Sequence, residues 1–195
     1  MSDAAETHPE GEAERALALR LENLRRQNGL SLDEVALKSG ISRATISRIE
    51  RGETSPTASV LGKLCTAYGL TMSRLLAAIE EDAPRLIRRA EALKWRDPET
   101  GFERTVVSPP AKGYATEIAW GELPRGADIR YDAAPVSGIE QHFLVFEGEL
   151  LVECSGNTYL LEAGDCLRFK INGASRVRNP GGATARYLVV NSQPS

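Results

Sequence analysis

Arginine and hydroxyl side chains gather in the segment SRATISRIER at residues 42–51. Read as an α-helix, this segment turns Ile46 and Ile49 to one side and leaves the other side polar. Arginine can donate two hydrogen bonds to guanine, Ser and Thr can bond base edges or phosphates, and a helix fits the major groove. The polar side therefore has the chemistry for binding DNA through Arg43, Thr45, Ser47, Arg48 and Arg51.

A solvated charged stripe is the alternative explanation of the same pattern. Residues 11–80 carry a net charge of only +2, and residues 81–195 carry −2, so the charge balance does not decide between the two. The surrounding elements and motifs have to decide.

Five short helices are predicted around this segment. Apolar spacing and a Gly29 stop predict the first over 14–28, and Ser31 with Glu34 forms a capping box for the second, which ends at Gly40. Ser42 can cap the third helix. For the last two we expect an N-cap at Ser55 followed by Pro56, and an N-cap at Thr71.

Beyond Ile79 the pattern changes to strands separated by Gly and Pro, which is typical of an antiparallel sandwich or barrel. The turn sequence DPETG at 97–101 lies between two predicted strands. We therefore expect a disordered tail at 1–13, a helical domain at 14–79, a linker and leading β-hairpin at 80–111, and a β-domain at 112–195. Further strands are predicted at 114–120, 129–131, 141–146, 150–154, 158–161, 166–170 and 187–190.

Composition limits the chemistry of the 195-residue chain. It has only two His and three Cys, with no CxxC pair, which argues against a zinc site or a disulfide framework and favours a reducing compartment. No apolar run reaches the ~20 residues that span a bilayer, and the N-terminus has no signal-peptide pattern. We expect a cytoplasmic protein that binds no membrane.

The helical half resembles the DNA-binding domain of lambda-repressor-like (Xre/Cro-type) transcription factors, through LRRQNGLSLDEVALKSGISRATISRIERGETSPTASVLGKL and especially SRIERGE-x-SP. The resemblance implies a helix-turn-helix domain that binds double-stranded DNA through the third helix. Bases would be read by Arg43, Ala44, Ser47 and Arg48, with Ser42, Thr45 and Arg51 near phosphates.

The same family pairs an Arg in helix one with a Glu late in helix three, and Arg25 and Glu50 occupy those places. Such a partly buried pair would support the recognition helix without touching DNA. One departure concerns Leu32, which stands where family members often have a Gln that contacts phosphate. We expect the loss of one phosphate contact but not of DNA binding.

The β half resembles a cupin barrel, a double-stranded β-helix or jelly roll, through FLVFEGELLVECSGNTYLLEAGDCLRFKINGASRVRNPGG. Most cupins bind a divalent metal through HxHxxxE and a later His. Here Pro135, Ser137, Gln141 and Ser175 stand in those places, so we expect neither metal nor cofactor. His142 is next to Gln141 on a strand and is expected on the opposite face, as a surface or packing residue.

A metal-free barrel can still hold a small molecule in its interior. The expected effector-binding residues could receive a carboxylate or another small anion. They are Arg130, Gln141, Phe143, Arg168 and Ser175. Cys154 and Cys166 flank one hairpin, so a redox switch is conceivable, but free Cys residues are more often buried apolar residues.

Together these features predict a two-domain protein, all-α then all-β, that is not an enzyme and regulates transcription. It is expected to be a homodimer on a pseudo-palindromic operator, with a small-molecule effector in the cupin domain. Two alternatives remain open: a metal-dependent cupin oxygenase or isomerase tethered to DNA, and a repressor whose cupin domain is purely structural.

Overall fold

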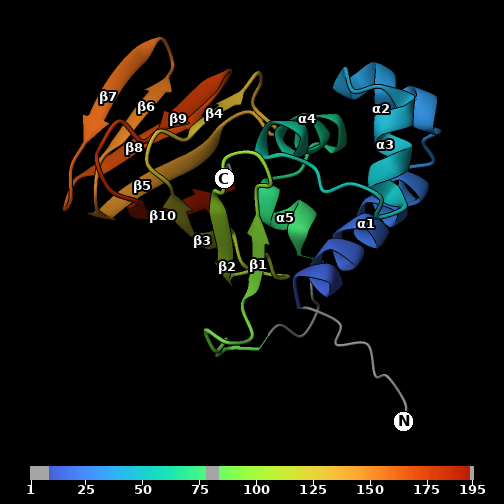
Figure 1. The fold of residues 1–195 in the computed structure, drawn as a ribbon, viewed down its shortest axis with the longest axis horizontal. Helices are drawn as coiled ribbons and strands as arrows, with labels where there is room; N and C mark the ends of the chain where they lie inside the picture. The colour runs from blue at the N-terminus through green and yellow to red at the C-terminus, as the bar shows by residue number, and fades with distance from the viewer. Residues whose placement is uncertain (1–8, 78–83, 194–195) are drawn as a thin grey trace.

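The computed structural model describes residues 9–77 and 84–193, which form a helical half followed by two antiparallel sheets (Figure 1). The five helices are α1 (Pro9–Gln27), α2 (Leu32–Ser39), α3 (Arg43–Glu50), α4 (Ala58–Tyr68) and α5 (Met72–Leu76). Their apolar faces share one core, whose most deeply buried members include Val35, Ile46, Leu61 and Leu75. No helix in these two ranges is long and apolar enough to cross a membrane.

The local capping signals explain most helix boundaries. The capping box of Ser31 and Glu34 is present at the start of α2, and Gly40 ends that helix in the left-handed conformation that Gly adopts without strain. Thr71 caps α5 as expected, because its side chain accepts a hydrogen bond from the Arg74 N–H.

Two of the expected boundaries are wrong. The first helix begins at Pro9, so residues 9–13 are helical and not part of a disordered tail; residues 1–8 of that tail lie outside the described residues. Pro is tolerated at the first helical position, and Glu and Ala in EGEA favour the helix. The cap of α4 is Thr57, whose hydroxyl accepts from the Val60 N–H at 3.3 Å, and not Ser55.

The β half contains two sheets. The strands are β1 (Leu93–Arg96), β2 (Glu103–Ser108), β3 (Thr116–Leu123), β4 (Asp128–Tyr131), β5 (Ile139–Glu147), β6 (Leu150–Cys154), β7 (Asn157–Leu161), β8 (Cys166–Ile171), β9 (Ser175–Arg178) and β10 (Ala185–Ser192). One sheet has the order β1-β2-β3-β10-β5-β8, and the other has the order β4-β9-β6-β7. The seven strands predicted after residue 111 are all present, whereas β9 was not predicted.

The leading hairpin β1–β2 extends the six-stranded sheet through β3, so it belongs structurally to the β half. The inward side chains of both sheets form the barrel interior. A large buried residue, Tyr187, lies over Gly121 so closely that a Cβ there would come within 2.6 Å of its ring. Gly121 thus makes room for Tyr187 inside the barrel.

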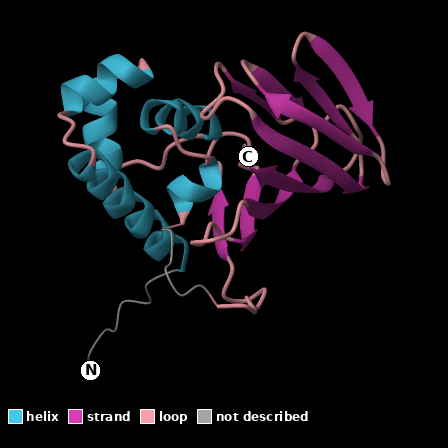
Figure 2. Ribbon diagram, turned by 180° about the vertical axis from the view of Figure 1, so that it is seen from behind, coloured by secondary structure: helices cyan, strands magenta, loops and turns pink. Residues whose placement is uncertain are grey.

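The two halves pack directly on each other. Helix α4 contacts α2 on one side and strand β4 on the other, and the buried apolar residues of both halves form one continuous cluster. Seen from the front and from behind, α4 and α5 lie next to the sheets, while α2 and α3 lie on the far side of the helical half (Figures 1 and 2). The predicted recognition helix therefore faces away from the barrel.

Candidate DNA-binding surface and ligand pocket

Helix α3 begins with a closed network of hydroxyl groups. The Thr45 backbone N–H donates to Ser42 Oγ at 3.1 Å, and the two hydroxyl oxygens are 2.7 Å apart. Ser42 satisfies an otherwise free N–H of the first turn and so fixes where the helix starts. Ile46 and Ile49 are each only 2% exposed and hold the opposite side of α3 in the core.

Three arginines project from the outer side of α3 and its C-terminal end. The side chains of Arg43, Arg48 and Arg51 are 64%, 60% and 55% exposed. Ala44 is also exposed, and Ser47 is partly buried beside them. The residues expected to read bases therefore share one solvent-facing surface, with no bulky side chain at position 44 to keep a base edge away.

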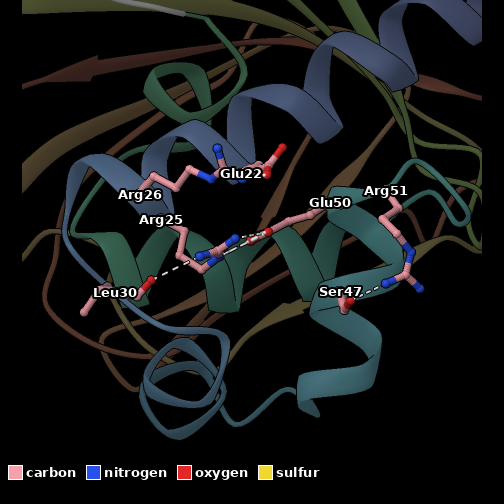
Figure 3. A network of polar contacts seen from close by, with 7 residues as sticks. All are labelled: Glu22, Arg25, Arg26, Leu30, Ser47, Glu50 and Arg51. Atoms are coloured by element: carbon pink, nitrogen blue, oxygen red, sulfur yellow. Dashed lines mark hydrogen bonds and ion pairs between the residues drawn. The ribbon is translucent and has the colours of Figure 1, made fainter.

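The Glu53 carboxylate, which was not among the predicted site residues, contacts two of these arginines. Glu53 accepts hydrogen bonds from Arg51 Nε at 2.6 Å and Arg51 Nη2 at 2.9 Å, and its Oε2 is 3.9 Å from Arg48 Nε. Arg51 Nη1 also donates to Ser47 Oγ (Figure 3). These contacts hold the exposed guanidinium groups in place, and they raise the pKa of Arg51 and lower that of Glu53.

The expected pair Arg25–Glu50 is present and joins α1 to α3 (Figure 3). Arg25 Nε lies 2.8 Å from Glu50 Oε1, and Arg25 Nη2 lies 2.7 Å from Oε2, which makes a two-pronged contact. Arg25 Nη1 donates to the Leu30 carbonyl at 3.2 Å. The side chains are only 15% and 7% exposed, so this pair links the recognition helix to the core instead of facing DNA.

Inside the barrel lies a cavity of about 90 Å³, which residues of the helical half also line. Gln141, Phe143 and Ser175, which the sequence placed inward, line this cavity, and so does Pro135. Gln141 Nε2 donates to Asn191 Oδ1 at 2.8 Å, which links β5 to β10 at the cavity wall. These residues give the pocket neutral polar groups and an aromatic side.

The two arginines expected in the pocket are outside it. Arg130 is 66% exposed, because the neighbouring residues Ile129 and Tyr131 take the inward positions of β4. Its Nη2 lies 3.7 Å from Asp128 Oδ2. Arg168 is exposed as well. Phe169 lines the cavity, and because side chains alternate along β8, its neighbour Arg168 lies on the outer face.

Arg104 on β2 supplies the charge that was sought at those positions. It lines the cavity, is only 6% exposed, and donates from Nη2 to Ser73 Oγ of α5 at 3.1 Å. Its Nε has no hydrogen-bond partner within the described chain. This position could not be predicted, because Val106 and Val107 are both apolar and leave open which face of β2 turns inward.

A second buried charge lies near Arg104. Glu117 is 3% exposed, and burial raises the pKa of its carboxyl, while the Thr71 hydroxyl and then Arg104 and Arg74 act in the opposite direction. Counting only partners in residues 9–77 and 84–193, neither carboxylate oxygen accepts a hydrogen bond of ordinary geometry. Polar groups at the junction of α5 and the six-stranded sheet are therefore incompletely satisfied.

The positions where most cupins have metal ligands hold no His, Asp or Glu. Ser137 is exposed and donates to Asn172 Oδ1 at 3.3 Å, while Gln141 and Ser175 face the cavity. Within the described ranges no three His, Cys, Asp or Glu residues are grouped so that they could hold a metal ion. His142 lies on the outer face, opposite Arg168, with Nε2 2.8 Å from Glu140 Oε1.

The cysteines are free thiols. Cys154 is buried in the four-stranded sheet and Cys166 is exposed in the six-stranded sheet, so the two are not on paired strands. Burial raises the pKa of Cys154 and raises that of Cys65 to about 12, which disfavours the reactive thiolate at both.

Comparison with known proteins divides the chain in the same way. Residues 21–75 match the helix-turn-helix family HTH_3, and residues 126–191 match the Cupin domain family Cupin_2. The chain is 26% identical over 179 residues to the HTH-type transcriptional regulator SutR of Escherichia coli K12, covering 89% of this chain and 92% of that one. It is 28% identical over 149 residues to PuuR of the same organism, also an HTH-type transcriptional regulator, covering 74% and 77%.

The fold of the whole chain has a solved counterpart. The crystal structure of an HTH_3 family transcriptional regulator from Vibrio cholerae superposes with a TM-score of 0.78 at 24% sequence identity, covering 95% of this chain and 99% of that one. The order of a five-helix domain and a cupin barrel is thus the same in both.

Proposed function

Since the chain carries an HTH_3 helix-turn-helix domain followed by a cupin domain, we propose that it is a transcriptional regulator that binds specific DNA sequences through α3. The observation that supports this most strongly is the outward surface of α3. Its three arginines are more than half exposed, while the buried Arg25–Glu50 pair fixes the helix on its inner side. A helix held firmly on its inner side, with exposed basic side chains on its outer side, suits the major groove.

Each side chain of this surface has a proposed role. Arg43, Ala44, Ser47 and Arg48 read base edges, and the N-terminal and C-terminal ends of the segment contact phosphates through Ser42, Thr45 and Arg51. Arg51 must first exchange its carboxylate partner Glu53 for a phosphate, since both need the same guanidinium edge. The contact between Arg51 and Glu53 is therefore expected to break only when a DNA phosphate takes the place of the carboxylate.

A homodimer is the proposed binding form. One recognition helix contacts few base pairs, whereas two helices about 34 Å apart read successive major grooves of a pseudo-palindrome. The cupin half, on the opposite side of the molecule from α3, is available to join two copies without blocking DNA.

The cupin half is proposed to bind a small anionic effector rather than to catalyse a reaction. Its cavity combines the guanidinium of Arg104 with Gln141 and Ser175, and the positions equivalent to metal ligands carry no metal-binding side chain. A guanidinium with neutral polar neighbours is suited to a carboxylate.

Selection of bound sequences from a random DNA pool tests the DNA-binding proposal. The wild-type protein is expected to enrich a motif with two half-sites whose centres are 10–10.5 base pairs apart, or a multiple of that. Arg48→Ala is expected to lose preference at one position of each half-site, about 1–3 kcal/mol of discrimination. Arg186→Ala, which removes an exposed Arg from the cupin sheet, is the control and should enrich the same motif. Enrichment of no motif by the wild type refutes the proposal.

A further inference from the structure

The ligand cavity has walls from both halves of the protein. Its lining includes Gly62 and Cys65 of α4, together with Thr71 and Met72 at the start of α5. The remaining lining comes from the two sheets and the loops that connect their strands. A molecule in this cavity therefore touches the helical half directly, and no separate element is needed to transmit its presence.

Arg104 is the charged group best placed to receive such a molecule. Within the described ranges no carboxylate oxygen lies within 4.0 Å of its guanidinium, although the side chain is 94% buried. The unpartnered Nε adds an unused donor. The buried Glu117 carboxylate interacts with Arg104 electrostatically but accepts no hydrogen bond from it, so a ligand carboxylate would supply the hydrogen bonds that the guanidinium leaves unmade.

The same guanidinium also anchors α5. Nη2 of Arg104 donates to Ser73 Oγ, and Ser73 is completely buried at the junction between α5 and the sheet. Ser73 also closes the helix, because its carbonyl accepts from the Ala77 N–H at 2.8 Å. A carboxylate that turns Arg104 toward the cavity would weaken its hold on Ser73.

Resting on the proposed function, we propose that the cavity binds a small monocarboxylate through Arg104 and that this binding loosens α5 from the β half. The cavity volume of about 90 Å³ suits a ligand of a few non-hydrogen atoms. A second negative charge is disfavoured because the buried carboxylate of Glu117 lies close enough to Arg104 for the two charges to interact. Neutral contacts would come from Gln141, Ser175 and Asn191, which line the same space.

Acetate and its uncharged isostere acetamide test the ligand site without any DNA. Titrations followed by protein NMR should show acetate binding at least tenfold tighter than acetamide or the dianion malonate. Arg104→Gln should weaken acetate binding at least tenfold. Arg104→Lys, which keeps the positive charge, should bind acetate more tightly than Arg104→Gln. Arg168→Gln, which neutralises an exposed arginine of β8, is the matched control and should bind acetate like the wild type.

Hydrogen exchange tests the coupling, again without DNA. The amides of Leu75 and Ala77 close α5 through bonds to the Thr71 and Ser73 carbonyls. Saturating acetate should speed their exchange at least threefold in the wild type, with acetamide as the control. Ser73→Ala should bind acetate normally but exchange quickly at both amides with and without it.

Equal binding of acetate and acetamide, no binding of either, or unchanged binding by Arg104→Gln would overturn the ligand site. Acetate binding with unchanged or slower exchange at Leu75 and Ala77 would overturn the coupling. Neither readout involves DNA. A wild-type protein that selects no DNA motif would refute the proposed function, while acetate binding and hydrogen exchange would still test the ligand site and its coupling to α5.

Discussion

Replacing Arg25 by Met should destabilise the protein far more than replacing its neighbour Arg26. Both residues lie on α1, and each forms one ion pair with a Glu. They differ in burial: the Arg25 and Glu50 side chains are 15% and 7% exposed, whereas those of Arg26 and Glu22 are 68% and 29% exposed. Figure 3 shows Arg25 and Arg26 on α1, with Glu22 on the same helix and Glu50 on α3.

The magnitude follows from what each change leaves behind. Met retains most of the aliphatic length, so Arg25→Met mainly removes three N–H to carboxylate contacts of 2.7–3.1 Å and the bond to Leu30. Glu50 then remains charged and almost buried. Loss of one partner of a fully buried pair costs about 3–5 kcal/mol, and the residual exposure favours the lower end, about 3 kcal/mol. Arg26→Met breaks an exposed pair, which contributes at most about 0.5 kcal/mol.

Thermal unfolding followed by circular dichroism measures the difference. For a chain of this length, about 3 kcal/mol lowers the Tm by about 6–12 °C, whereas Arg26→Met should shift it by no more than about 2 °C. The double variant Arg25→Met/Glu50→Met should be less destabilised than the sum of its single changes, since it leaves no unpaired charge. Equal Tm values for Arg25→Met and Arg26→Met would refute the reasoning that this pair is a buried support of α3.

Three further changes probe other parts of the molecule. Glu53→Gln removes the carboxylate that competes with phosphate for Arg51, so DNA affinity measured by fluorescence anisotropy should rise about two- to fivefold; a decrease would mean that Glu53 orients Arg51 for DNA instead. Gly62→Ala places a Cβ 2.6 Å from the Tyr131 ring and should lower the free energy of unfolding in urea by about 1–2 kcal/mol. In a Tyr131→Leu background the same change should raise it by up to about 1 kcal/mol, because Ala has the higher helix propensity. Destabilisation in both backgrounds would argue against the clash. Burial raises the pKa of Glu117 in the folded state above its usual 4.5, so wild-type stability falls as the pH rises from the unfolded-state pKa to the folded-state pKa. Glu117→Gln lacks this loss, so its free energy of unfolding in urea, relative to that of the wild type, should increase from pH 4 to pH 7. A difference that stays constant with pH would contradict the raised pKa.

Features that depend on neighbours along the chain could be predicted from the sequence by itself. Hydroxyl caps and glycine stops located α2, α3 and α5, because these groups satisfy backbone N–H and C=O groups within one turn. Alternation within β5 put Gln141 and Phe143 inside and His142 outside, because side chains of a strand change face at every residue. For Arg168 the same rule needs one structural fact, that its neighbour Phe169 lines the cavity.

The tertiary structure alone decided which arginine carries the buried charge and what it touches. Two adjacent valines hide the alternation of β2, and its register against β3 shifts between Val106 and Ser108, so the inward face of Arg104 could not be counted along the chain. Its neighbour Ser73 is 31 residues away, in the other half of the molecule. Contacts of this kind arise when a helix packs on a sheet, and the packing depends on the shape of both surfaces together rather than on either segment's own pattern.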